Sequence, residues 1–138
     1  MGNTVRFGIS LDEKLLIDFD RLIDQKHYTN RSEAIRDLIR KAFVKKEWQA
    51  DKEVMGVISL VYDHHQHKLQ DKVTEVQHGY HHHIVSTTHV HMDHDNCLEV
   101  IIVRGKAREI QELTDKLVAL RGIRDGHLAM SSTGRFLH

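Results

Sequence analysis

The stretch of sequence that decides the fold runs from His78 to Cys97 and reads HGYHHHIVSTTHVHMDHDNC. Ten of the thirteen histidines of the chain lie between His64 and His94, so this stretch and its approach hold most of them. The only cysteine of the chain closes the stretch. Imidazole and thiolate are the side chains that first-row transition metals prefer, so the rest of the chain is best understood as a support for this segment.

A β-hairpin is predicted around the last two histidines before the turn. The β-branched run 84–92 indicates a strand, so His89 and His91 should project to one face, about 6.6 Å apart along the backbone. Turn residues follow, and the next apolar run indicates the returning strand. This hairpin should set Cys97 opposite His91 and Glu99 opposite His89. Two imidazoles and a thiolate would then converge on a metal site, although a plain polar strand face or a loose histidine-rich metal trap remains the alternative.

Length, charge and cysteine content limit the class of protein. The chain has 138 residues and a formal net charge of zero, so no overall basic field points to nucleic acid. One cysteine cannot form an internal disulfide, and a metal-binding thiolate requires reducing conditions. We find no signal peptide and no apolar run of membrane-spanning length. A cytoplasmic protein without a membrane segment is expected.

The first fifty residues predict a small dimeric domain. Residues 3–10 alternate in the manner of a short strand, and two capping-box patterns, at 10–13 and 30–33, predict the starts of two amphipathic helices. One strand and two helices make a poor core for a domain of this size. A lone strand also lacks partners for its backbone groups. A second copy of the chain, with the two strands paired antiparallel, would supply both.

The remainder of the chain alternates in the order strand, helix, strand, strand, helix, strand. This order predicts an α+β protein whose second domain has a ferredoxin-like βαββαβ sheet with both helices on one face. The predicted domains are residues 1–50 for the N-terminal domain, 51–54 for a linker, 55–133 for the second domain and 134–138 for a tail. The predicted elements of the second domain are strand 55–62, helix 65–77, the hairpin, helix 107–120 and strand 123–130.

The N-terminal domain resembles the ribbon–helix–helix repressors, and the sequence NRSEAIRD at positions 30–37 carries the resemblance. In that family the paired strands enter the DNA major groove and the N-terminus of the second helix holds a phosphate. The resemblance implies DNA contacts by Arg6, Gly8, Ser10, Asn30, Arg31 and Ser32. Gly8 departs from the family, which often has a hydroxyl residue at this groove-facing position, so one base contact is lost from each strand.

The whole chain resembles the nickel-responsive ribbon–helix–helix regulators (NikR), which carry a ligand-binding domain of the ACT type. The match lies in the spacing His-x10-His-x-His-x5-Cys, formed here by His78, His89, His91 and Cys97. The resemblance implies one Ni(II) per chain in a planar site, with His78 donated by a neighbouring chain across a homotetramer interface. The hairpin alone offers three donors and a planar ion takes four, so this ligand set completes the site.

The resemblance also implies groups around the metal and a second cation. Tyr62, Gln77 and Glu99 are expected to orient the ligands and tune the site. A second, weaker cation would lie between the domains on Glu33 and Asp37, which are one helical turn apart. An alternative interpretation from the sequence is that Glu33 caps its own helix and Asp37 pairs with Lys41. His27 stands where the family commonly has glycine, and histidine can adopt the left-handed conformation needed there.

The expected function is that of a tetrameric regulator, a dimer of dimers that binds a palindromic double-stranded operator when loaded with nickel and represses nickel-uptake genes. Two alternatives stay open: a sensor of the same build for Cu(II), Co(II) or Zn(II), and a metal buffer or chaperone that uses the histidine-rich loop. An enzyme is not expected. A cysteine–histidine hydrolase is disfavoured because Cys97 shares its face with two histidines and no oxyanion-hole motif is visible.

Overall fold

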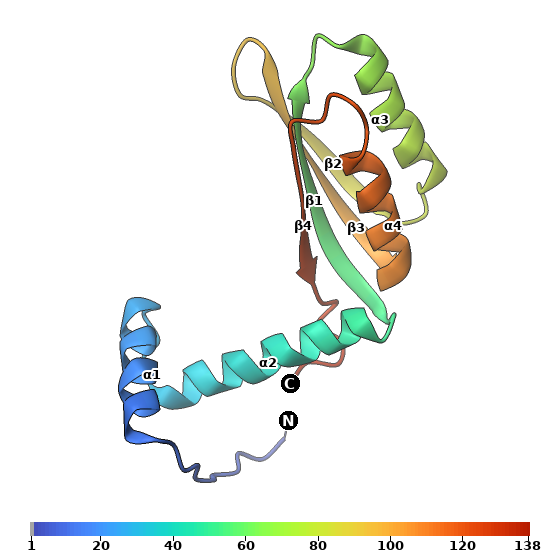
Figure 1. Ribbon diagram of the computed structural model, residues 1–138. Coiled ribbons are helices and arrows are strands. Elements are labelled where there is room, and N and C mark those ends of the chain that lie inside the picture. Colours follow the sequence, from blue (N-terminus) through green and yellow to red (C-terminus); the bar gives the residue numbers. More distant parts are fainter. Residues whose placement is uncertain (1) are drawn as a thin grey trace. The chain divides into compact units, whose positions relative to one another are not determined.

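The computed structural model describes residues 2–138, which divide into two compact units, one ending at Ile39 and the other beginning at Arg40. Each unit is described by itself below. Eight regular elements follow one another along the chain (Figure 1). They are α1 (Glu13–Gln25), α2 (Arg31–Gln49), β1 (Glu53–Asp63), α3 (His67–Gly79), β2 (Ile84–His91), β3 (Asn96–Lys106), α4 (Ala107–Val118) and β4 (Asp125–Ser131).

In the N-terminal unit, the ends of α1 follow from local side-chain chemistry. The helix is capped by Asp12, whose carboxylate accepts the Lys14 N–H at 3.0 Å, and not by the predicted Ser10. Asp12 is preferred over Ser10 as the cap because its negative charge also complements the positive end of the helix dipole. At the other end, His27 adopts a φ of 61°, as expected, and Tyr28 N–H bonds to the Ile23 carbonyl at 3.1 Å. This pattern is a Schellman motif.

The predicted strand 3–10 is not formed in the single chain, where residues 2–12 have no regular structure. A strand exists only through hydrogen bonds to a neighbouring strand, and the unit offers none. The alternate side chains of Val5, Phe7 and Ile9 are 80%, 71% and 56% exposed. Apolar residues of both helices are exposed as well within this unit, among them Leu15, Leu22, Leu38 and Ile39. One copy of this unit therefore does not cover its own apolar surface.

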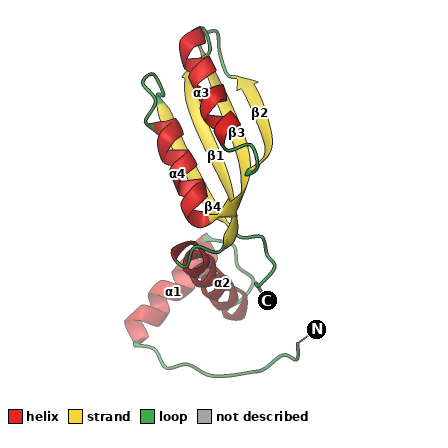
Figure 2. Ribbon diagram, turned by 90° about the vertical axis from the view of Figure 1, so that its right-hand side faces the viewer, coloured by secondary structure: helices red, strands yellow, loops and turns green. Residues whose placement is uncertain are grey.

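The C-terminal unit is built on a four-stranded antiparallel sheet with strand order β2-β3-β1-β4. Helices α3 and α4 lie on the same face of this sheet (Figure 2). The order of elements along the chain and across the sheet is the predicted ferredoxin-like βαββαβ arrangement, so the α+β fold class is confirmed. The individual elements differ from the predicted ranges by only a few residues at their ends.

The core lies between the sheet and its two helices. In β1 and β3, every second side chain is buried, as expected for strands with one covered face. The fully or nearly fully buried members include Val54, Ile58, Leu60, Tyr62, Cys97, Ile101, Val103, Leu69, Val73, Ile110, Leu113 and Leu117. The other face carries Val57, Val61, Leu98, Val100 and Ile102, which are only partly buried, and this apolar face is open in the single chain.

The predicted linker, residues 51–54, is an ordered part of the C-terminal unit. Strand β1 begins within it at Glu53, and Val54 is completely buried. The Asp51 carboxylate accepts the Arg108 N–H at 2.9 Å and so caps the start of α4, while the Lys52 backbone carbonyl accepts the Ala107 N–H at 3.1 Å. Of the charged side chains in this stretch, Asp51 caps a helix and Glu53 pairs with Arg104 at 2.8 Å. In the part of the chain that the structure describes, none of the helices is both long and apolar enough to cross a lipid bilayer.

Candidate metal centre

The β2–β3 hairpin has the register predicted from the sequence. Its antiparallel pairing sets His91 opposite Cys97 and His89 opposite Glu99. Cys97 and Glu99 belong to the buried series of β3, so the covered, helix-bearing face of the sheet is the one that these four residues share. Strand β2 is the edge strand, which leaves both histidines accessible at the rim of the core. The backbone thus places two imidazoles beside one buried thiol.

His89 is held by a network of buried polar groups. Its Nε2 lies 2.5 Å from the Glu99 carboxylate and 2.9 Å from the Tyr62 hydroxyl. The second carboxylate oxygen of Glu99 accepts the Gln77 amide N–H at 2.8 Å, and Gln77 in turn accepts the Thr87 hydroxyl at 3.2 Å. Of the three residues that the resemblance places around the metal, Tyr62 and Glu99 contact His89, and Gln77 reaches it only through Glu99. The role of each toward a bound metal remains a prediction.

The electrostatics of this network follow from burial. Glu99 is only 4% exposed, and burial raises the pKa of its carboxyl above the usual range, although the neighbouring His89 and Gln77 act in the opposite direction. Burial and the nearby Glu99 carboxylate raise the pKa of Tyr62, which keeps the phenol a hydrogen-bond donor. Burial also raises the pKa of the Cys97 thiol. A cation would favour the charged forms of both Glu99 and Cys97, so the site is suited to a positive ion.

The remaining predicted ligands point to other partners in the single chain. The ring of His91 lies 4.6 Å from that of His64, which sequence reasoning left unassigned. His78, in the last turn of α3, is exposed and stacks on His81 at 5.8 Å. Within residues 2–138, two groups of three possible metal ligands have ligand atoms within 4.8 Å of one another, and neither includes His89, His91 or Cys97. The register brings the three positions together, but their side chains have not closed around a common point.

The histidine run 81–83 is partly used by the fold. The Nδ1 of His83 lies 3.3 Å from the Arg104 carbonyl, and its Nε2 lies 3.1 Å from the Glu109 carboxylate, so both ring nitrogens have acceptors. A Cβ added at Gly105 would come within 2.5 Å of this ring, which explains the glycine at that point of β3. His83 therefore connects α4 to β3. No signal in the sequence alone distinguishes it from its two neighbours.

The residues predicted to contact DNA are all exposed in the N-terminal unit. Asn30 is also the cap of α2, since its side chain accepts the Glu33 N–H at 2.9 Å. Arg31 is engaged, because its guanidinium donates two hydrogen bonds to Asp20 on α1, at 2.9 and 2.8 Å. A Cβ added at Gly8 would touch nothing within 4 Å, so glycine is not required there by the single chain.

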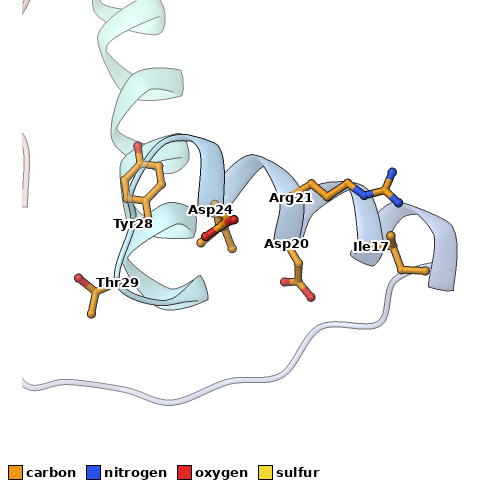
Figure 3. A pocket seen from close by; sticks show the side chains of 7 residues that line it. Ile17, Asp20, Arg21, Asp24, Tyr28 and Thr29 are labelled. Carbon is orange, nitrogen blue, oxygen red and sulfur yellow. The ribbon is translucent and has the colours of Figure 1, made fainter.

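An open hollow lies beside this arginine–aspartate pair. It is lined by α1 residues, including Ile17, Asp20 and Asp24, and by Tyr28 and Thr29 of the following turn (Figure 3). None of the residues predicted to bind metal or DNA lines it. The hydroxyl of Tyr28 donates to Asp37, one of the two residues predicted for a second cation. Glu33 and Asp37 do not form one of the clustered ligand groups within the described residues, so the second cation remains a prediction.

Both halves of the chain match known families. Residues 55–131 match the family described as NikR C terminal nickel binding domain, and residues 5–46 match ribbon-helix-helix protein, copG family. A protein of Desulfotalea psychrophila, provisionally named a nickel-responsive regulator, is 69% identical over 133 residues, which is 96% of this chain and 98% of the relative. A relative from Geobacter metallireducens with the same provisional name is 56% identical over 139 residues and covers 100% of both chains.

A solved structure supports the fold alone. An uncharacterized protein from Thermotoga maritima superposes with a TM-score of 0.52 at 15% identity, over 56% of this chain and 96% of that chain. The two sequence matches define a class, a regulator that joins a ribbon–helix–helix domain to a nickel-binding domain. With these domains and relatives, the chain belongs to the family of nickel-responsive transcriptional regulators (NikR). That family is not one of enzymes, which confirms the expectation from the sequence.

Proposed function

We propose that this chain represses nickel-uptake genes by binding a palindromic operator when Ni(II) occupies a site of three histidines and one cysteine. His89, His91 and Cys97 of one chain and His78 of a neighbouring chain would be the ligands. Bound nickel would supply a rigid bond between two chains. Each chain would hold one ion, and the protein would act as a cytoplasmic homotetramer, a dimer of dimers.

The observation that carries the proposal is the way the hairpin and Glu99 prepare His89. The register pairs His91 with Cys97 and His89 with Glu99. A carboxylate accepts hydrogen bonds, so the Nε2 of His89, 2.5 Å from Glu99, carries the proton. The lone pair then lies on Nδ1, which leaves that nitrogen as a metal ligand. An imidazole that donates its other N–H to a carboxylate is the usual arrangement at protein metal sites.

The donor set fits nickel when a second chain takes part. Two imidazoles and a thiolate leave a planar ion one ligand short. His78 is exposed at the end of α3, and its ring is engaged only with His81 in the described chain, so it is accessible to another copy. The open apolar face of the sheet, with Val57, Val100 and Ile102, is a surface that a second copy would cover.

DNA binding rests on a second pairing of chains. Val5, Phe7 and Ile9 alternate along an extended segment and are exposed, which suits two such segments paired as an antiparallel ribbon. In that ribbon the intervening Arg6, Gly8 and Ser10 would face the major groove. Residues 1–50 alone are expected to dimerise and to bind DNA weakly, with an affinity that falls steeply as salt rises. A well-folded monomeric fragment would contradict this part of the proposal.

The experiment that tests the function combines metal and operator binding. Purified protein is titrated with Ni(II) while the visible spectrum is recorded, and operator binding is measured by gel shift with and without the metal. We expect one equivalent per chain with thiolate-to-nickel absorption, and DNA binding that requires nickel. Cys97→Ala should abolish the absorption. A metal buffer would ignore DNA, and a sensor of another ion would respond to Cu(II), Co(II) or Zn(II) more strongly than to Ni(II).

A further inference from the structure

A second group of metal-ligating side chains lies at the end of the sheet where β1 and the β2–β3 hairpin finish (Figure 1). Two overlapping sets of three residues share His65, and the ligand atoms within each set lie within 4.8 Å of one another. One set is Asp63, His64 and His65, which follow one another in the chain. The other set is His65, His94 and Asp95, which come from two separate segments. None of these residues belongs to the proposed nickel ligands.

The backbone fixes the two segments against each other. Asp63 pairs with Asn96 at the last rung of the β1–β3 ladder, and the His64 N–H bonds to the Asp95 carbonyl at 3.2 Å. The hairpin tip is itself built on Asp93, whose carboxylate accepts the N–H groups of Asp95 and Asn96 at 2.9 and 2.8 Å. The positions of the donors are therefore set by the protein and do not depend on an ion.

The orientation of His65 is fixed as well. Its Nε2 lies 2.8 Å from the carbonyl oxygen of His94. A carbonyl can only accept a hydrogen bond, so Nε2 carries the proton and Nδ1 keeps the lone pair. Its backbone N–H also donates to Asp63 at 2.9 Å, which holds this residue in place. A histidine that donates one ring N–H to a backbone carbonyl and presents the other nitrogen is arranged as metal-binding histidines are.

One more polar atom in this region lacks a partner. The Nδ1 of His64 is buried and makes no hydrogen bond in the described chain. A buried nitrogen without a partner normally costs free energy, and His64 lies 4.2 Å ring to ring from His65, with which it belongs to the first set of clustered residues. By contrast, the exposed pair of His127 and Asp125 on β4, 3.0 Å apart, belongs to no cluster of three ligand residues among residues 2–138. That pair is an ordinary surface contact.

We infer that His65, His94 and Asp95 form a second binding site for a divalent transition-metal ion, with Asp63 beside it as a further carboxylate. Two imidazoles and carboxylate oxygens suit Zn(II), Ni(II), Co(II) and Cu(II), and no thiolate takes part. The site is exposed and has few protein donors, so it exchanges its ion readily and keeps water as further ligands. An ion here joins the end of β1 to the hairpin tip. Its ligand His94 lies three residues along the chain from both His91 and Cys97.

The test uses the full chain and Ni(II) as the probe. Equilibrium dialysis counts the ions bound per chain, the visible spectrum reports any thiolate-bound nickel, and imidazole NMR signals report which histidines lie beside the paramagnetic ion. We expect a second, weaker class of one ion per chain that adds no thiolate absorption and broadens the signals of His65 and His94. His65→Ala and His94→Ala should each weaken this class at least tenfold.

The controls separate this site from the proposed function. His127→Ala is the matched control and should leave both classes unchanged. Cys97→Ala should remove the thiolate band and keep the second class, so the failure of one site does not imply failure of the other. Retention of the thiolate band by His65→Ala and His94→Ala shows that the hairpin is intact. The inference is overturned if wild type shows no second class, or if that class survives both histidine substitutions.

Discussion

Replacing Glu99 by glutamine should weaken nickel binding without weakening the fold. The Glu99 carboxylate accepts from His89 at 2.5 Å through one oxygen and from Gln77 at 2.8 Å through the other. An amide offers only one acceptor oxygen, so its NH2 group must face one of these two donors. Gln77 cannot simply turn over, because its own oxygen accepts the Thr87 hydroxyl. The Glu99→Gln variant therefore loses the charge and part of the network that orient His89.

The magnitude follows from the role of such partners. Loss of a hydrogen-bond partner behind a metal-ligating histidine typically lowers metal affinity about 10- to 100-fold, or roughly 1.4 to 2.7 kcal/mol. Two opposed effects act on the stability of the metal-free protein. Burial raises the pKa of Glu99, so its contribution to stability is present at low pH and is lost as pH rises through the raised pKa, a loss that a neutral amide removes. The amide NH2 group that faces a donor costs free energy, so the two effects oppose each other and the variant should melt within a few degrees of wild type at neutral pH.

The assay measures Ni(II) affinity by competition with a chelator and the melting temperature of the metal-free protein across pH. Glu53→Gln is the matched control, an acid-to-amide change on β1 whose carboxylate is half exposed and paired with Arg104 at 2.8 Å. It should leave nickel affinity unchanged. The reasoning is refuted if Glu99→Gln binds nickel as tightly as wild type, or if its metal-free form melts several degrees lower at neutral pH.

Three further predictions follow from the same contacts. Burial raises the pKa of the Cys97 thiol, so nickel binding at neutral pH should release a proton, and nickel affinity should rise about tenfold per pH unit below that pKa. Calorimetry in buffers of different ionisation enthalpy measures the proton release. The absence of any release would mean that the thiolate is already formed. Asp20→Asn should tighten binding to all DNA sequences alike, by about two- to fivefold, because it releases Arg31 to bind phosphate. The control Asp18→Asn removes only the partner of Arg21 and should leave DNA affinity unchanged. The His78→Ala variant should still bind nickel, but nickel should no longer tighten its operator binding much. In wild type this tightening is expected to be about a hundredfold, roughly 2.7 kcal/mol. The same tightening in His78→Ala would show that the signal does not pass between chains.

The sequence predicted the backbone of the site well because period and turn chemistry determine it. The β-branched run 84–92 and the turn residues after it predict both the strands and the register, and the structure has His91 opposite Cys97 as expected. The order of elements likewise followed from periodicity. The resemblance to a known family supplied what the pattern could not, namely which histidine would come from another chain.

Three features could not be predicted, each for a physical reason. The strand 3–10 depends on a partner strand, so it is absent in one chain and stays a prediction for a dimer. The cap of α1 was placed at Ser10 because two capping residues lie close together, and spacing does not show that Asp12 is preferred. The ordered role of Asp51 depends on contact with Arg108, far along the chain. Long-range contacts of this kind leave no periodic trace in the sequence.

The side chains of the site reveal what a pattern of alternation leaves undetermined. Strand register determines where the Cα atoms lie, whereas the rotamer of each histidine depends on its local hydrogen-bond and ring contacts. His89 turns to Glu99, and His91 turns to the ring of His64, so a common ion must compete with these contacts. The contact of His89 with Glu99 can persist when a metal binds, because it uses Nε2 and leaves Nδ1 for the metal. The His91 and His64 rings are tilted against each other, and any change in this contact when His91 turns toward an ion contributes to the free energy of metal binding. Affinity in this site is therefore set by the contacts that the ligands give up as well as by the donor atoms themselves.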